Sequence, residues 1–89
     1  MSLTTLISQA LEARFAPTSL SVIDESDQHH GHAGWREGGE THFRIDIVSE
    51  AFAGKGRVDR HRLVNACLEP AFARGLHALA IRARAPGDA

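Results

Sequence analysis

The side chains best suited to chemistry in this sequence are six histidines and a single cysteine. His29, His30 and His32 are clustered, and His77 lies apart from them near the C-terminal end. One cysteine cannot form an intrachain disulfide, and it also excludes a CxxC redox pair or a cysteine-rich zinc site within the chain. A metal site here must therefore use imidazole, or thiolates from another molecule.

Each of these histidines also has a structural interpretation. His77 shares strand parity with Leu79 and Ile81, so it could lie at the edge of the core with a hydrogen bond to a nearby carbonyl. The three clustered histidines are equally compatible with a solvated loop, although their clustering favours metal binding. Trp35, in the same glycine-rich stretch, either anchors that stretch onto the domain or contacts a partner.

Three other side chains are predicted to be structural. His42 is expected on the solvent-facing side of a strand, and His61 at the start of a long helix. Cys67 follows Ala66 and precedes Leu68 in an apolar stripe, where a free cysteine behaves as a small hydrophobic residue. A reactive thiol would need exposure and an electropositive setting.

Hydrophobic periodicity predicts the elements that position these residues. Apolar spacings of three and four predict a helix that starts after Ser2 and ends before Pro17. Strands are predicted over residues 20–24, 41–49 and 76–83 from β-branched residues and alternation. The first helix is expected to bury Leu3, Leu6, Ile7, Ala10, Leu11 and Phe15.

A second long helix is predicted between the last two strands. Asp59 is its expected N-cap, Pro70 is expected to kink it, and Gly75 to end it. Residues 25–40, between the first two strands, form a connection far longer than the usual two to five residues of a hairpin, which makes them the first place to look for function. The apolar stripe of the second helix is expected to comprise Leu63, Val64, Cys67, Leu68, Ala71 and Phe72.

These elements predict an α/β (α+β) domain of order α-β-β-α-β, with a possible short extra helix near Ala51 and Phe52. The first two strands should form an antiparallel hairpin, whereas the helix between the second and third permits a parallel, right-handed crossover. The expected architecture is a three-stranded mixed sheet with helices on one face.

Composition limits the function classes. Eighty-nine residues, 43% hydrophobic and 24% charged, predict one domain over residues 2–85 with a flexible tail at 86–89. A formal net charge of -1 gives no overall attraction to nucleic acid or membrane. The sequence has no signal-peptide pattern and no apolar stretch of about 18 residues, so we expect a cytoplasmic protein without membrane contact. We expect no enzyme, because Asp24, Ser26 and the histidines come without a nucleophile elbow or a phosphate-binding glycine loop.

Several segments in fixed order resemble the BolA family. They are DES at 24–26 with His29 three residues later, ETHFR at 40–44, IVS at 47–49 with Phe52, Gly54, RHRLV at 60–64 and GLHALAI at 75–81. The resemblance extends from about residue 3 to residue 86. It implies a class II KH-like fold, which agrees with the predicted order of elements.

The resemblance implies an adaptor that binds a monothiol glutaredoxin and shares a bridging [2Fe-2S] cluster with it, for iron–sulfur trafficking or iron and redox sensing. The glutaredoxin cysteine and glutathione are expected to supply thiolates. This chain is expected to supply His77 and a loop histidine, with His29 favoured over His32 because of its spacing from Ser26. A chain with one cysteine agrees with sulfur ligands from a partner. The isolated chain is expected to be monomeric and to bind no cluster tightly.

The alternative function is a DNA-binding transcriptional regulator of stress response or morphology. Four cations, Lys55, Arg57, Arg60 and Arg62, lie within eight residues and are opposed by Asp59. Such a patch can contact phosphates, although the GKGR sequence at 54–57 lacks the GxxG spacing of a KH loop. A solvated face, or a basic surface that docks an acidic patch or carboxylates, is the other interpretation.

Overall fold

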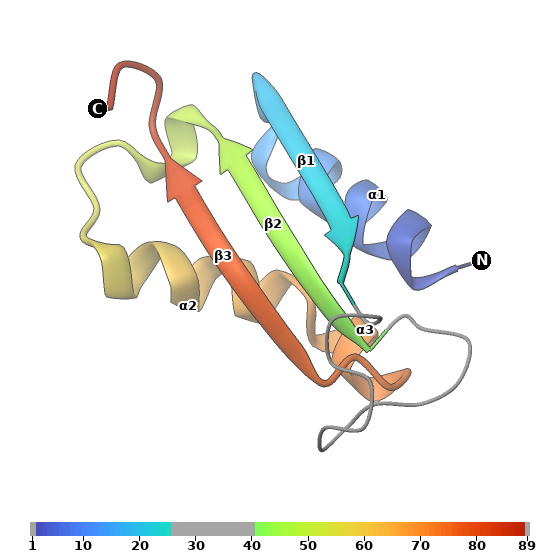
Figure 1. The fold of residues 1–89 in the computed structure, drawn as a ribbon. Helices are drawn as coiled ribbons and strands as arrows, with labels where there is room; N and C mark the ends of the chain where they lie inside the picture. The colour runs from blue at the N-terminus through green and yellow to red at the C-terminus, as the bar shows by residue number, and fades with distance from the viewer. Residues whose placement is uncertain (1, 26–40, 89) are drawn as a thin grey trace.

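The computed structural model describes residues 2–25 and 41–88. In chain order, these form α1 (Leu3–Phe15), β1 (Ser19–Asp24), β2 (His42–Val48), the 3-10 turn η2 (Glu50–Phe52), α2 (Arg57–Cys67), α3 (Glu69–Ala73) and β3 (Ala78–Arg84). The strands form one sheet in the order β1-β2-β3, with β1 and β2 antiparallel and β2 and β3 parallel (Figure 1).

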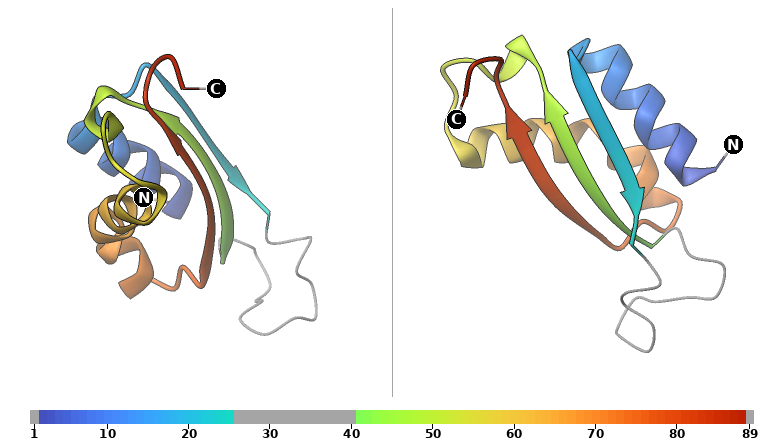
Figure 2. Two further views of the ribbon diagram at one scale, coloured as in Figure 1. Left: turned by 90° about the vertical axis from the view of Figure 1, so that its left-hand side faces the viewer. Right: turned by 45° about the horizontal axis from the view of Figure 1, so that its top comes forward.

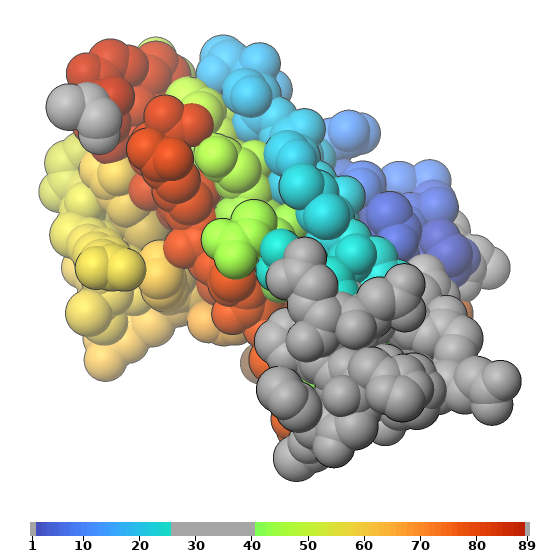
Figure 3. All heavy atoms as spheres, viewed as in Figure 1, coloured from blue at the N-terminus to red at the C-terminus, as the bar shows by residue number. Residues whose placement is uncertain are grey.

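The helices lie on one face of this sheet (Figure 2). On the opposite face, side chains of β1, β2 and β3 form the surface of the molecule themselves (Figure 3). The predicted α-β-β-α-β fold, with a mixed sheet, helices on one face and a short extra helical turn, is therefore confirmed.

Helix α1 forms because its sequence supplies both a cap and an apolar face. Ser2 is the N-cap, and its side chain accepts a hydrogen bond from the Thr5 backbone N–H at 3.1 Å. Ala16 ends the helix in a left-handed conformation, with φ 42° and ψ 56°. The predicted face is confirmed: Leu3, Ile7, Leu11 and Phe15 are buried, while Leu6 and Ala10 are partly buried against the core.

The central strand β2 provides the middle of the core. Phe43, Ile45 and Ile47 alternate onto the face that the helices cover, and each is at most 1% exposed. Ser49, just beyond the strand, joins this layer to α1, because its hydroxyl donates to the Phe15 carbonyl at 2.6 Å. One buried hydroxyl thus fixes the end of β2 against the end of α1.

The helix predicted from Asp59 to Gly75 is wrong at its start and in its middle. It begins at Arg57 with Gly56 as N-cap, so Asp59 lies within the first turn. It is interrupted at Leu68, and α3 follows with Pro70 in its first turn. Proline fits there because the first N–H groups of a helix have no acceptor within the helix.

No helix within residues 2–25 and 41–88 is long and apolar enough to cross a membrane.

The buried face of α2 and α3 differs from the prediction at Phe72. Val64, Leu68 and Ala71 are buried as predicted, but Phe72 is 37% exposed. Val64, Leu68 and Ala71 keep the helical spacings of four and three, and Phe72 lies beside this buried face rather than within it, so the prediction that Phe72 belongs to the stripe is wrong. Gly75 ends the helical region as predicted, with φ 115°.

Strand β3 begins two residues later than predicted. The backbone N–H of Leu76 still donates to the Ala71 carbonyl of α3 at 3.1 Å, and the Leu76 side chain is only 4% exposed. Strand pairing starts at Ala78, opposite His42. His77 therefore lies immediately before the strand rather than within it.

Candidate functional site

Three chain segments meet at one end of the sheet. Strands β2 and β3 are parallel and begin there, while β1 is antiparallel and ends there (Figure 1). The Glu25 backbone N–H donates to the His42 carbonyl at 2.8 Å. The Thr41 carbonyl accepts hydrogen bonds from the N–H groups of His77 at 2.8 Å and Ala78 at 3.2 Å. These bonds place His77 directly beside Thr41, which follows the segment 26–40, while Glu25, which precedes it, lies on the other side of β2.

His77 is well placed to bind a ligand. Its side chain is exposed, so the interpretation of His77 as a residue at the edge of the core does not describe the structure. Its ring centroid lies 5.3 Å from that of His42, and the two rings are inclined at 53°. An exposed imidazole held by a backbone hydrogen bond at the start of a strand can present a ring nitrogen to a metal or to a partner.

His42 does not lie where the sequence predicted. Strand alternation directs it away from the helices, yet it is only 6% exposed. Its Nδ1 lies 2.9 Å from the Thr41 hydroxyl oxygen, and the His77 ring lies beside it. The prediction of a solvent-facing His42 is wrong because this residue begins β2, where adjacent strand ends surround it. The pairing of His42 with His77 had no signal in the local sequence, since it depends on the β2–β3 register.

The other predicted ligand region lies outside the described residues. His29, His30 and His32 all belong to the segment 26–40, and so does Trp35. The residue that leads into this segment is well anchored: the Glu25 carboxylate accepts a hydrogen bond from Arg44 Nε at 3.0 Å, and its side chain is 14% exposed. Glu25, the last described residue before this segment, is therefore fixed to β2 by its side chain and by its backbone.

The donor chemistry near His77 is that of imidazole. Within the two described ranges, no group of three or more histidine, cysteine, aspartate or glutamate side chains could hold a metal ion. Cys67 is half-buried and packs against the core, as predicted, and its Sγ donates to the Ala10 carbonyl at 3.4 Å. Burial raises the pKa of the Cys67 thiol, and the nearby Arg14 opposes this only in part. Cys67 therefore supplies neither a thiolate nor an open sulfur ligand.

The four predicted cations do not form a single patch. Lys55 and Arg62 line one side of α2, around a pocket of about 360 Å³ that also includes Asp59 and Leu63. Asp59 lies 3.9 Å from the Arg62 guanidinium, and both side chains are largely exposed. The single continuous patch suggested by the spacing is thus divided by the helix.

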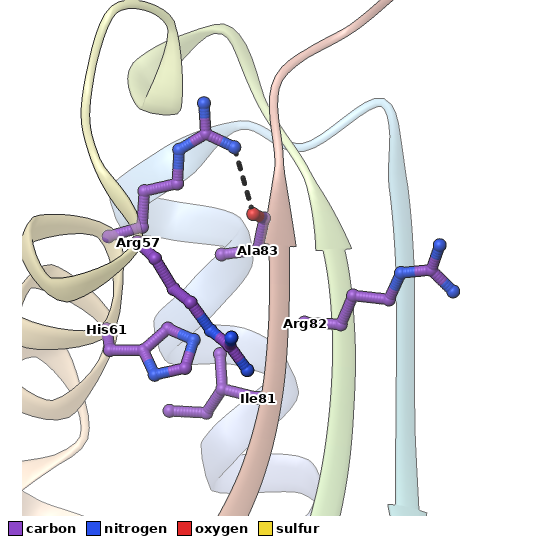
Figure 4. Close-up of a pocket in the computed structure, with 6 residues that line it drawn as sticks. Arg57, His61, Ile81, Arg82 and Ala83 are labelled. Atoms are coloured by element: carbon purple, nitrogen blue, oxygen red, sulfur yellow. Dashed lines mark hydrogen bonds between the residues drawn. The ribbon is translucent and has the colours of Figure 1, made fainter. Parts of the chain in front are cut away.

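Arg57 and Arg60 lie on the other side, in a groove of about 260 Å³ between α2 and β3. His61, Ile81, Arg82 and Ala83 complete this groove, and Figure 4 shows His61 of α2 beside Ile81 of β3. The prediction of His61 near the start of the helix is confirmed, but no sequence pattern indicated that Arg82 would join these residues.

Arg60 is bound by the protein itself. Its Nε donates to the Lys55 carbonyl at 2.9 Å, and its Nη1 donates to the Ala83 carbonyl at 3.1 Å and to Asp88 Oδ2 at 2.6 Å. Its side chain is only 16% exposed. Arg60 therefore connects the turn before α2 to β3 and to the chain after it, and it is less available to a ligand than its neighbours.

The fold and the site define a small α+β domain with an exposed histidine at one end of a three-stranded sheet. The family model for BolA-like protein matches residues 11–88, and the chain belongs to this family. Members of the family are not enzymes, which confirms the prediction of no enzymatic activity.

Relatives and solved structures support this assignment along the whole chain. An "Uncharacterized protein in cobS 5'region" of Sinorhizobium sp is 52% identical over 89 residues, covering 99% of this chain and 96% of its own. "DNA-binding transcriptional regulator BolA" of Vibrio cholerae is 46% identical and covers 85% of this chain and 68% of its own.

A solved structure, "BolA domain of SufE1 from Arabidopsis thaliana", covers 100% of this chain and 98% of its own, with a TM-score of 0.89 and 44% sequence identity. The "SufE-like protein 1, chloroplastic/mitochondrial" of Arabidopsis thaliana is much longer: the 92% of this chain that matches it corresponds to 23% of its length. The relatives thus include a protein of nearly the same length as this chain and a longer protein of which the matching region is one part.

Proposed function

We propose that this protein is an adaptor that binds a monothiol glutaredoxin and co-ligates a bridging [2Fe-2S] cluster through His77 and a loop histidine, His29 being favoured over His32. Its role is iron–sulfur trafficking or iron and redox sensing. The glutaredoxin cysteine and glutathione supply the thiolates. The observation that carries the proposal is the position of His77, which is exposed and hydrogen-bonded through its backbone to Thr41, the residue that follows segment 26–40.

The donor set fits such a shared cluster. Iron–sulfur clusters take thiolate ligands, and those that accept two imidazoles on one iron have raised reduction potentials. In this chain the sole thiol is half-buried with a raised pKa, so imidazole is what the chain can contribute. A bound cluster would supply electron storage and transferable iron and sulfide. This chain's residues would hold it, and because a protonated imidazole cannot bind a metal, retention of the cluster would depend on pH.

The test is a titration of the apo-protein with a monothiol glutaredoxin, glutathione, ferrous iron and sulfide. We expect a heterodimer whose visible absorption and circular dichroism differ from those of the glutaredoxin homodimer. His77→Ala should abolish the heterodimer spectrum, whereas His61→Ala, in the groove between α2 and β3, should leave it unchanged. His29→Ala and His32→Ala, made separately, identify the loop ligand. An unchanged spectrum in His77→Ala would contradict the ligand assignment.

The second candidate function is DNA binding by the cations beside α2. Lys55, Arg57 and Arg62 favour it: they surround the turn before α2 and its first two turns, and within residues 2–25 and 41–88 neither Lys55 nor Arg57 forms an ion pair. Arg60 was the fourth cation expected in this patch, but its hydrogen bonds within the protein reduce its contribution. Removal of one phosphate-binding cation by mutation should reduce the salt slope of binding by about 1. Binding that does not depend on salt would exclude this function.

The remaining properties belong to the same proposal. The isolated chain is a cytoplasmic monomer without membrane contact, and it binds no cluster tightly. Residues 2–85 form the BolA-like domain, and residues 86–89 form a tail that can leave it. Sedimentation of the purified apo-protein tests the monomer, and iron analysis after gel filtration tests the weak retention of cluster.

A further inference from the structure

A carboxylate of this chain occupies an anion site beside the groove between α2 and β3. Asp88 Oδ2 accepts a hydrogen bond from Arg60 Nη1 at 2.6 Å and another from the Ala85 backbone N–H at 2.9 Å. These two hydrogen bonds lower the pKa of the Asp88 carboxyl below its usual value. The Asp88 Oδ2 atom thus lies between a guanidinium and a backbone amide, and phosphate oxygens also accept hydrogen bonds from these two kinds of donor.

The groove next to this site holds more positive charge than Asp88 neutralises. Arg57, Arg60 and Arg82 line it together with His61, and the apolar side chain of Ile81 and Ala83 form part of its wall (Figure 4). Within the described residues, Arg60 is paired with Asp88, while Arg57 and Arg82 have no ion pair. Figure 4 shows the Arg82 side chain directed away from the groove, across β2, so a monovalent carboxylate leaves one guanidinium group of the groove, that of Arg57, without a counter-charge.

Asp88 is held weakly enough to be replaced. Its side chain is 36% exposed, and ion pairs that water reaches contribute little to stability. It lies beyond Pro86 and Gly87, and Gly87 has φ 88°, a conformation that glycine adopts without strain. Asp88 also lies beyond Arg84, the last residue of β3, so its release from Arg60 breaks no backbone pair between β2 and β3.

We propose that the groove between α2 and β3 binds phosphate-bearing ligands and that Asp88 is their internal competitor. In the closed arrangement Asp88 occupies Arg60. In the open arrangement a ligand phosphate takes the place of the Asp88 carboxylate on Arg60 and also contacts Arg57. This site does not involve His77 or any cluster, so its test is independent of the test of the adaptor function proposed above.

The experiment compares two variants that each remove one negative charge. Asp88→Asn removes the competing carboxylate, and its amide oxygen can still accept the Ala85 N–H, so the fold is retained. Glu12→Gln is the matched control, because Glu12 is exposed on α1, which does not line the groove. The probes are inorganic pyrophosphate and a short DNA duplex, each titrated by NMR at fixed ionic strength. They distinguish a small phosphate from a nucleic acid as the source.

We expect Asp88→Asn to bind at least one of the two probes about two- to fivefold more tightly than the wild-type protein, in line with a partly exposed ion pair. Glu12→Gln should differ from wild type by less than about twofold, because salt screens a charge that does not touch the site. In the wild-type protein, the Ala85 amide resonance should move during the titration as Asp88 leaves.

Two results would overturn the proposal. If both variants bind the probe more tightly by the same factor, the gain in affinity comes from net charge alone. If the Ala85 amide resonance does not move during saturable binding, Asp88 is not displaced. Failure of both probes to bind either the wild-type protein or Asp88→Asn at low salt would exclude the phosphate site altogether. Arg57→Ala, which leaves the Asp88 hydrogen bonds intact, should weaken binding in both backgrounds.

Discussion

Replacing Ser49 with alanine should destabilise the domain strongly, although the change removes a single oxygen atom. Ser49 is 1% exposed, and its hydroxyl makes two hydrogen bonds. It donates to the Phe15 carbonyl at 2.6 Å and accepts from the Ala51 N–H at 3.1 Å. Phe15 is the last residue of α1, so its carbonyl has no partner within the helix.

The loss of these two hydrogen bonds determines how far the free energy of unfolding should fall. A buried carbonyl left without its donor costs about 1–3 kcal/mol. Losing the side-chain cap of η2 adds about 1 kcal/mol. The sum, about 2–4 kcal/mol, is a large part of the roughly 4–13 kcal/mol expected for a domain of this size. It corresponds to a fall in melting temperature of about 10–30 °C.

Urea unfolding followed by circular dichroism measures this loss. Ser49→Ala should lower the midpoint without a change in the m-value, because the surface exposed on unfolding is the same. Ser21→Ala is the matched control, since Ser21 is exposed on β1, and it should change stability by no more than about 0.5 kcal/mol. If the two variants unfold at the same midpoint, the reasoning that Ser49 fixes α1 against β2 is refuted.

Three further predictions concern other parts of the domain. Ala16→Gly should raise the free energy of unfolding by about 0.5–1 kcal/mol, because Ala16 has φ 42° and only glycine adopts this conformation without strain; a loss of stability in urea would contradict this. Cys67 should react with iodoacetamide at pH 8 more slowly in the folded than in the urea-unfolded protein, because burial raises its thiol pKa; equal rates would contradict it. The stability that Asp88 contributes should be fully present above pH 3.8 and disappear as the pH falls through its lowered folded-state pKa, so the difference between wild type and Asp88→Asn should vanish in acid. A difference that persists at pH 2 would contradict this assignment.

The sheet and α1 were predictable because each residue's environment follows from local periodicity. Phe43, Ile45 and Ile47 alternate with polar residues, and their burial needs no knowledge of the rest of the chain. The break at Leu68 was predicted less well. A proline inside an apolar stripe is compatible both with a kinked helix and with the first turn of a new one, and packing of Leu68 and Ala71 into the core decides between them.

Single residues of the site could be predicted from sequence motifs, but the contacts between residues far apart in the sequence could not. His77 could be singled out from its motif, but its contact with His42 depends on the parallel register of β2 and β3, which local sequence does not encode. The pairing of Arg60 with Asp88 joins residues 28 positions apart and depends on where the chain turns after β3. A run of cations in the sequence therefore predicted a common surface, whereas the helix separates Lys55 from Arg57.

The adaptor function is tested most directly by pulsed electron paramagnetic resonance of the reduced cluster in the heterodimer with a glutaredoxin. The chain would be labelled with ¹⁵N-histidine and the glutaredoxin left unlabelled. We predict ¹⁵N hyperfine coupling from two histidines of this chain, with one coupling absent in His77→Ala and both retained in His61→Ala. A reduced cluster without any ¹⁵N coupling, or one whose couplings are unchanged in His77→Ala, would contradict the proposal that this chain holds the cluster through His77.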